Sequence, residues 1–131
     1  MKIIIPPKYH DKLGNKIIAT RGVGGCVFLI SEKYWEVSIH NIESMKFNNP
    51  NTQKFALFLI NSGVVKIDRG NDGEITIPKH LKDYAGIKKI KDIIFLENKE
   101  VVEVWNQIRL RKYRAKLLKE KKEAKQIKMF S

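Results

Sequence analysis

The sequence of 131 residues contains one cysteine and no long run of apolar residues. The single cysteine, Cys26, excludes an internal disulfide framework and a cysteine-rich zinc site, and it fits a reducing compartment. No apolar stretch approaches the roughly 18 to 20 residues that a membrane span needs, and Pro6 comes too early for a signal peptide. We therefore expect a cytoplasmic protein that has no membrane partner.

Acidic residues are also scarce, with 14 against 26 lysines and arginines, and the net charge is +12. The excess is uneven, because residues 109–131 carry ten basic and two acidic side chains and a net charge of +8. With 43% hydrophobic residues, the chain has enough apolar surface for a folded core. A basic globular protein of this kind is attracted to nucleic acid, but the total charge alone identifies no partner.

The chain contains an internal repeat with an offset of 72 residues, which aligns Ile3–Pro6 with Ile75–Pro78. The alignment continues through further pairs: Asp11 with Asp83, Gly14 with Gly86 and, after a four-residue insertion, Ile17–Ile18 with Ile93–Ile94. Each copy predicts a short strand ending at proline, a short helix, a glycine stop and two β-branched strands. The last two strands form hairpins, with Lys16–Thr20 and Cys26–Ile30 in the first copy and Asp92–Glu97 and Glu100–Trp105 in the second.

Two helices are expected between the copies. The first is Glu32–Ser44, with Ser31 as its N-cap, and the second is Thr52–Asn61. The strand Val64–Ile67 then opens the second copy, whereas the first copy has no room for its equivalent before Lys2. A shortened gene model or a degenerate paralogue would explain that missing strand.

The segment from Arg109 to Ser131 predicts an amphipathic basic helix. It has no glycine or proline, and a helical stripe interrupted by Glu120 is formed by Leu110, Tyr113, Leu117, Ala124 and Ile127. Its basic side chains either keep the protein soluble or lie along DNA phosphates or an acidic surface of another subunit. The residues considered for these contacts are Arg109, Arg111, Lys112, Arg114 and Lys116.

These motifs resemble the MraZ family. Its first half is matched by Ile3–Pro6, Thr20–Gly22, Cys26–Ile30 and Tyr34–Glu36, and its second half by Phe58–Asn61 into Asp68, Gly73–Pro78, Tyr84–Ile87 and Val102–Asn106. The resemblance implies an α+β fold: two swapped-hairpin β-barrel repeats of the SpoVT-AbrB type joined by helices, followed by a basic C-terminal helix. The expected units are the first repeat at 1–36, a helical linker at 37–61, the second repeat at 62–107 and the basic tail at 108–131.

The resemblance also implies a function. It predicts a sequence-specific transcriptional regulator, a repressor of the division and cell-wall gene cluster, that binds repeated promoter boxes in double-stranded DNA as a homo-oligomeric ring. The protein would then be associated with the nucleoid. We expect no catalytic residue, no metal and no cofactor, because the three histidines lack partners at metal-ligand spacing and no acid, base and nucleophile stand together.

Candidate DNA-binding residues follow from the family pattern, in which each copy carries an aspartate and, four residues on, an arginine that contacts DNA. Lys2 occupies the arginine position of the first copy, which keeps the charge but not the bidentate fork. Glu74 occupies it in the second copy, where a carboxylate would repel phosphate. Asp68 lies six residues before Glu74, so the turn is longer, and Arg69 and Asn71 are the polar groups that could replace the arginine.

Two further basic residues, Arg21 and Lys66, complete the predicted DNA-binding set. Arg21 stands beside a glycine-rich turn, which favours a structural role or a rim charge over a base contact. Cys26, Trp35 and Trp105 are expected to be packing residues. Two other functions stay open: an AbrB-like antitoxin or partner-binding module whose basic helix docks on an acidic protein, and a nonspecific RNA-binding accessory protein.

Overall fold

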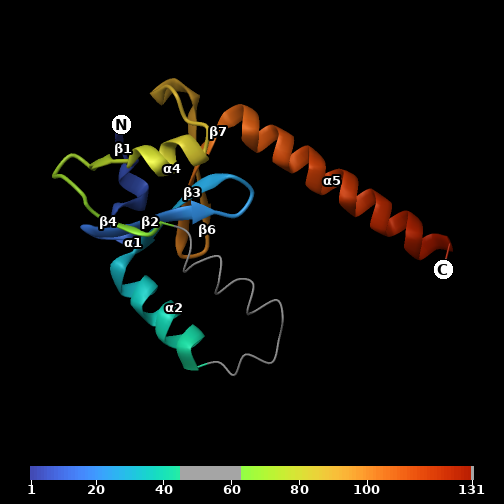
Figure 1. Ribbon diagram of the computed structural model, residues 1–131, viewed down its shortest axis with the longest axis horizontal. Helices are drawn as coiled ribbons and strands as arrows, with labels where there is room; N and C mark the ends of the chain where they lie inside the picture. Colours follow the sequence, from blue (N-terminus) through green and yellow to red (C-terminus); the bar gives the residue numbers. More distant parts are fainter. Residues whose placement is uncertain (45–62, 131) are drawn as a thin grey trace.

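The structure, a computed structural model, describes residues 1–44 and 63–130, with side chains described for residues 1–41 and 63–125. Its strands form two antiparallel sheets (Figure 1). The small sheet pairs β1 (Lys2–Ile4) with β5 (Glu74–Thr76). The large sheet has the order β4 (Val65–Asp68), β2 (Lys16–Gly22), β3 (Cys26–Ser31), β7 (Val101–Asn106) and β6 (Ile93–Asn98).

The helices are short except for two. The bounds are η1 (Pro7–Tyr9), α1 (His10–Leu13), α2 (Glu32–Ser44), α4 (Lys79–Tyr84), η2 (Ile90–Asp92) and α5 (Gln107–Phe130). The predicted N-cap of α2 is confirmed, because the backbone N–H of Tyr34 donates to Ser31 Oγ at 3.1 Å. The predicted helix Thr52–Asn61 lies outside the described residues.

The predicted α+β class is confirmed, but the expected barrels are not seen in the described part of the chain. The large sheet there is open, with β4 and β6 at its two edges, because each of these strands pairs on one side only. The small sheet has only two strands. The described strands therefore form an open sheet and a separate ribbon instead of two closed barrels.

Strands from the two copies of the repeat pair with each other. In the small sheet, β1 of the first copy runs antiparallel to β5 of the second, with Ile3 opposite Ile75. In the large sheet, β3 pairs with β7, and β4 from the second copy pairs with β2 from the first. The two copies therefore share their sheets, and neither copy keeps a sheet of its own.

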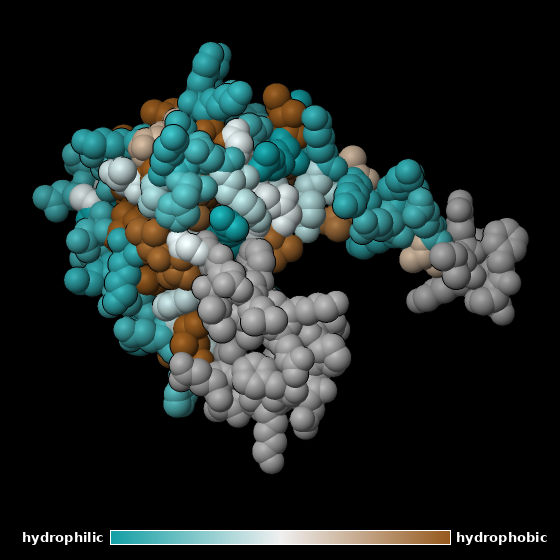
Figure 2. All heavy atoms as spheres, in the orientation of Figure 1, coloured by the Kyte–Doolittle hydropathy of each residue, from teal (hydrophilic) through white to brown (hydrophobic). Residues whose placement is uncertain are grey.

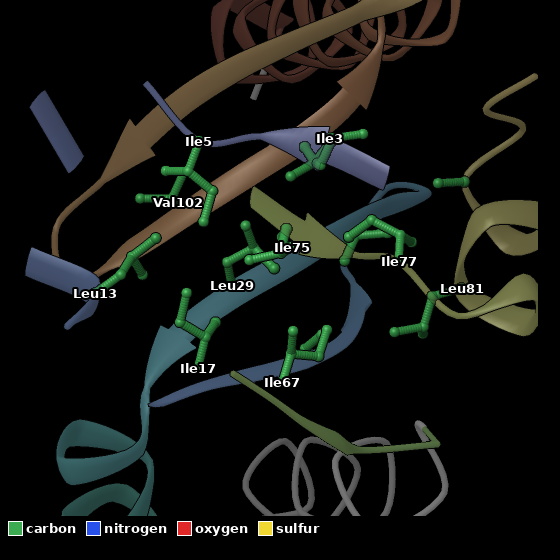
Figure 3. Close-up of a cluster of buried hydrophobic side chains, with 14 of the residues drawn as sticks. Ile3, Ile5, Leu13, Ile17, Leu29, Ile67, Ile75, Ile77, Leu81 and Val102 are labelled. Carbon is green, nitrogen blue, oxygen red and sulfur yellow. The ribbon is translucent and has the colours of Figure 1, made fainter. Parts of the chain in front are cut away.

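One hydrophobic core fills the space between the small sheet and one face of the large sheet (Figure 3). Alternation along β1 and β5 directs Ile3 and Ile75 into this core, and Leu29 and Val102 reach it from the large sheet. Each isoleucine or leucine buried in this way stabilises the fold by about 1.5–3 kcal/mol. Thus the small sheet is fixed by its inner face, and its outer face is left to solvent.

A second cluster joins the start of α5 to the opposite face of the large sheet. It contains Cys26, Trp105 and Leu110, all buried, and the rings of Trp105 and Tyr113 stack with centroids 5.3 Å apart. The expected packing roles of Cys26 and Trp105 are confirmed, while Trp35 is half-buried. Burial raises the pKa of the Cys26 thiol well above its usual range, so this side chain stays protonated.

Over its described side chains, up to Lys125, the helix α5 buries apolar residues only in its first turns. Leu110 is buried and Tyr113 is half-buried, but Leu117 is 41% exposed and Leu118 is 61% exposed. Figure 1 shows the helix extending from the end of β7 away from both sheets. Of the predicted apolar stripe, Leu110 and Tyr113 therefore attach the helix to the sheet, and the side chain of Ile127 lies outside the described residues.

Candidate nucleic-acid interface

Lys2 and Glu74, the two positions that the resemblance aligns with arginines expected to contact DNA, lie close together on the small sheet. Lys2 on β1 and Glu74 on β5 both point to solvent, and Lys2 Nζ lies 3.6 Å from Glu74 Oε1. Their side chains are 72% and 49% exposed, so the ion pair contributes only about 0–1 kcal/mol to stability. The Glu74 carboxylate nevertheless offsets part of the positive charge that Lys2 presents to a phosphate.

The loop between β4 and β5 carries the other two candidates on this side of the protein. Arg69 is held against the start of β2, because its Nη2 donates to Asn15 Oδ1 at 2.9 Å and its backbone N–H donates to the Asn15 carbonyl at 2.8 Å. The backbone N–H of Gly70 donates to the Glu74 carbonyl, which ties the loop to β5. Asn71 is exposed. The structure thus brings Arg69, Asn71, Lys2 and Glu74 into one neighbourhood.

Lys66 is a separate surface charge. It lies on β4, its side chain is 75% exposed, and its Nζ is 3.7 Å from Glu32 Oε2 at the first residue of α2. Because a surface ion pair of this kind contributes little energy, Lys66 is able to leave Glu32 and bind a phosphate instead. Lys66 therefore stays available to a ligand.

Arg21 is placed differently, near the far end of β2 from Asn15. Six residues of strand separate the two, a distance of roughly 20 Å at about 3.3 Å per residue. The guanidinium carbon of Arg21 lies 5.2 Å from the ring centroid of Tyr84, and the Tyr84 hydroxyl donates to the Gly22 carbonyl at 2.8 Å. Burial raises the pKa of Tyr84, which keeps this donor protonated. The contacts of Arg21 fit the structural role that the sequence favoured.

Arg109 is a structural residue that the sequence grouped with the basic tail. Its Nη1 donates to the carbonyl of Tyr84, at the end of α4, and at 3.4 Å to the carbonyl of Gly25. A cation at a helix C-terminus is favourable, because the last carbonyls carry partial negative charge. Gly86 makes room for it: φ there is +66°, and an added Cβ would lie 2.7 Å from Arg109 Nη2. The glycine after the predicted helix was the only sequence signal for this contact.

The remaining described part of α5 carries most of the exposed positive charge. Eight basic side chains between 111 and 125 are exposed: Arg111, Lys112, Arg114, Lys116, Lys119, Lys121, Lys122 and Lys125. Only two acidic residues, Glu120 and Glu123, accompany them. Within the described residues none of the eight forms an ion pair. Figure 2 shows this part of the helix as a mainly hydrophilic arm.

A groove beside the root of α5 differs from these basic surfaces. It has a volume of about 550 Å³, and its apolar lining includes Phe28, Leu96 and Tyr113. Two carboxylates, those of Glu97 and Glu103, also line it, together with one cation, Arg114. The carboxylates oppose the approach of a phosphate, which sets this groove apart from the basic surfaces.

No three histidine, cysteine, aspartate or glutamate residues among the described side chains come together as metal ligands. Among the described helices, none combines the length and apolar character that crossing a membrane requires. The structure is that of a basic α+β protein in which strands from the two sequence copies pair with each other in common sheets.

Comparison with known proteins identifies the family of the chain. No family model matches it. It is 31% identical over 112 residues to the transcriptional regulator MraZ of Clostridium beijerinckii, a match that spans 86% of this chain and 77% of that protein. It is 33% identical over 108 residues to the protein of that name from Halothermothrix orenii, spanning 82% and 73%. The match to that of Syntrophomonas wolfei is 30% over 105 residues, spanning 80% and 71%. The chain belongs to the MraZ family, which confirms the resemblance seen in its motifs.

Proposed function

We propose that the protein is a sequence-specific, DNA-binding transcriptional regulator. In this role it binds repeated boxes in double-stranded DNA upstream of the division and cell-wall gene cluster, as a homo-oligomeric ring, and represses that cluster. The observation that carries the proposal is its membership of a family whose relatives are named transcriptional regulators. The protein would act in the cytoplasm, in association with the nucleoid, without a cofactor.

The proposal includes the repeat architecture. Each copy, at 1–36 and 62–107, corresponds to one SpoVT-AbrB unit whose hairpin is exchanged with the other, with 37–61 as linker and 108–131 as tail. Support comes from the strand pairing, since β1 pairs with β5 and β2 with β4 across the two copies. Shared sheets would hold the DNA-facing residues of both copies in a fixed relation.

The outer surface of the small sheet and the loop at 69–73 are the proposed contact with DNA. Lys2 would exchange its ion pair with Glu74 for a phosphate, at a cost of about 0–1 kcal/mol. Asn71 has a free amide that is able to bond to a base edge, while Arg69 would have to share its guanidinium with Asn15. Lys66 and Arg21 would add charge at the margin.

One subunit of this kind reads few bases. Linking several copies in an oligomer raises the effective concentration of each contact, so that box spacing becomes part of the specificity. The carboxylate of Glu74 opposes DNA in every subunit. The proposed regulator would therefore depend on its oligomer more strongly than one with an arginine at both positions.

Footprinting on the gene's own upstream region tests the proposal. The expected result is protection of short boxes at a regular spacing, lost in the double variant Lys2→Ala/Arg69→Ala and kept in Lys88→Ala, whose exposed lysine lies outside the proposed contact. Uniform protection along the fragment would contradict sequence-specific binding. Co-purification of a second protein that displaces DNA would favour the antitoxin or partner-binding alternative instead.

A further inference from the structure

The root of α5 is fixed rigidly to the body. Asn106 Oδ1 accepts the backbone N–H groups of Ile108 and Arg109, at 2.9 and 3.2 Å, and so caps the helix N-terminus. The Arg109 guanidinium bonds to two backbone carbonyls, and Tyr113 stacks on Trp105. These contacts fix the direction in which the rest of the helix leaves the protein.

The arm beyond this root is long. The helix has 24 residues, or about 36 Å at a rise of about 1.5 Å per residue, and this is close to one turn of duplex DNA. It leaves the body beside Gly25, just beyond the end of β2 that is remote from Asn15 and Arg69. The arm is therefore attached roughly 20 Å from the loop at 69–73, given about 3.3 Å per residue of strand.

Positive charge occurs on two nearly opposite sides of this arm. Lys112, Lys116 and Lys119 follow i, i+4, i+7 spacing and share one side, since an α-helix turns by about 100° per residue. A second row on the opposite side consists of Arg114, Lys121 and Lys125, at i, i+7, i+11 spacing. Basic side chains on two opposite sides allow the helix to contact phosphates on both of those sides at once.

The pattern favours duplex DNA over the other anionic partners. A membrane-surface helix requires a continuous apolar face opposite its charges, and between Tyr113 and Lys125 the large apolar residues are two adjacent leucines, Leu117 and Leu118. Docking into a protein groove likewise requires apolar anchors at i, i+3 and i+4. Charge without an apolar face is suited to a phosphate backbone, which is contacted without regard to sequence.

We propose that the part of α5 from Arg111 to Lys125 binds the phosphate backbone of duplex DNA beside the boxes that the small sheet contacts. This inference rests on the proposed function and deepens it. The body supplies the sequence preference, and the arm adds affinity that is the same for every sequence. Removing charge from the arm weakens binding to all duplexes equally and leaves the preference for the boxes unchanged.

The test compares full-length variants by fluorescence anisotropy between 50 and 200 mM salt. Two arm variants, Lys112→Gln/Lys116→Gln/Lys119→Gln and Arg114→Gln/Lys121→Gln/Lys125→Gln, are matched by a control with the same loss of charge on the body. The control replaces three exposed lysines: Lys33→Gln/Lys88→Gln/Lys89→Gln. Circular dichroism verifies that all variants keep their helix content.

Each phosphate contact contributes about 0.9 to the steepness of the slope of log affinity against log salt. Each arm variant, which lacks three charges, should therefore have a slope that is shallower by up to about 2.7. The loss should be equal on the gene's own upstream duplex and on a scrambled duplex, and the control should keep the wild-type slope. An arm variant that behaves like the control overturns the inference, as does a loss confined to the specific duplex or to single-stranded RNA.

The same data separate this inference from the proposed function. If the wild-type protein binds both duplexes equally, the proposed function fails, but a reduced slope in the arm variants still supports phosphate binding by α5. If the wild type prefers its own upstream duplex while the arm variants match the control, the proposed function stands and the inference fails.

Discussion

Ile3 and Ile75 lie directly opposite each other in the small sheet, and they are the same position in the two copies of the repeat. A residue that pairs antiparallel with its own counterpart marks a local two-fold axis. The large sheet has a second such pair, because Phe28 and Glu103 are the third residues of β3 and β7 and also lie opposite each other. The described chain therefore folds with approximate internal two-fold symmetry.

The helices of the two copies obey the same symmetry. Lys12 of α1 donates to the Lys99 carbonyl at the tip of the β6–β7 hairpin, and it pairs with Glu97. Its counterpart 72 residues later is Tyr84, at the end of α4, which donates to the Gly22 carbonyl beside the turn of the β2–β3 hairpin. Each copy's short helix thus holds the hairpin of the other copy.

The first prediction concerns the core beneath the symmetry axis. Replacement of Ile3, which is 3% exposed, by alanine should lower the free energy of unfolding by about 2–5 kcal/mol, because it removes buried methyl groups and leaves a cavity. Ile4→Ala is the matched control on the same strand, since Ile4 is 63% exposed, and its effect should stay within about 0.5 kcal/mol. Urea denaturation measures both. Equal losses in the two variants would contradict the placement of β1.

A second prediction addresses the attachment of α5. Arg109→Ala removes the guanidinium that bonds to the carbonyls of Tyr84 and Gly25, and it should cost about 1–3 kcal/mol. Arg111→Ala, two residues away on the exposed side of the helix, should change stability by no more than about 0.5 kcal/mol. Thermal denaturation of the two variants provides the comparison. A larger loss of stability in Arg111→Ala than in Arg109→Ala would contradict the role of Arg109 in attaching α5.

Glycine substitutions give an independent third check of the same contact. Gly86→Ala should destabilise the protein by more than about 1–2 kcal/mol, because φ is +66° and the new methyl group would press on Arg109. Gly70→Ala is the control, since an added Cβ there would meet only ordinary contacts at 3.5 Å or more. If both glycines tolerate alanine equally well, the close approach of Arg109 to Gly86 is wrong.

The local elements were predictable from the sequence because their signals are local. Ser31 caps α2, and the helix bounds Glu32–Ser44 agree with the prediction. The offset of 72 residues also identified Ile3 and Ile75 as equivalent, although nothing in the sequence indicated that they would pair with each other. Pairing of β4 with β2 and of β3 with β7 joins segments far apart in the chain, and single strands carry no signal for such a choice.

The DNA-binding role of the candidate residues stays a prediction, and the sequence does not indicate how they are arranged. The family pattern pointed to Lys2 and Glu74 separately, and their ion pair follows only from the antiparallel register of β1 and β5. Similarly, the bond from Arg69 to Asn15 crosses 54 residues of sequence. Arg109 was read as one more basic residue of the tail, because its carbonyl partners belong to distant backbone.

A fourth prediction follows from the buried thiol. Burial raises the pKa of Cys26, so the folded state holds the proton at pH values where the unfolded chain, with a thiol pKa of about 8.5, releases it. Stability from this group is therefore complete below about pH 8.5 and falls above it, by up to about 1.4 kcal/mol per pH unit. Cys26→Ala should lack this component. The measurement is the free energy of unfolding of the wild type and of Cys26→Ala between about pH 8 and 10. If the two values change with pH in parallel, the thiol of Cys26 is not buried.

The ion pair on the small sheet gives the fifth prediction. Glu74→Gln removes the carboxylate that neutralises Lys2, so it should tighten DNA binding, and the gain should shrink as salt rises. Asp72→Asn is the control, because it removes one exposed negative charge from the neighbouring loop without freeing Lys2. Binding titrations at two salt concentrations distinguish them. A gain as large for Asp72→Asn would mean that only net charge matters.

The proposed function requires that this protein prefer particular duplex sequences over others. The most direct measurement is its affinity, at about 150 mM salt, for its gene's own upstream region and for a scrambled duplex of the same length and composition. Specific regulators bind their sites about 10³-fold or more tighter than other DNA, and the account predicts a clear preference of that kind. Equal affinity for the two duplexes would contradict it.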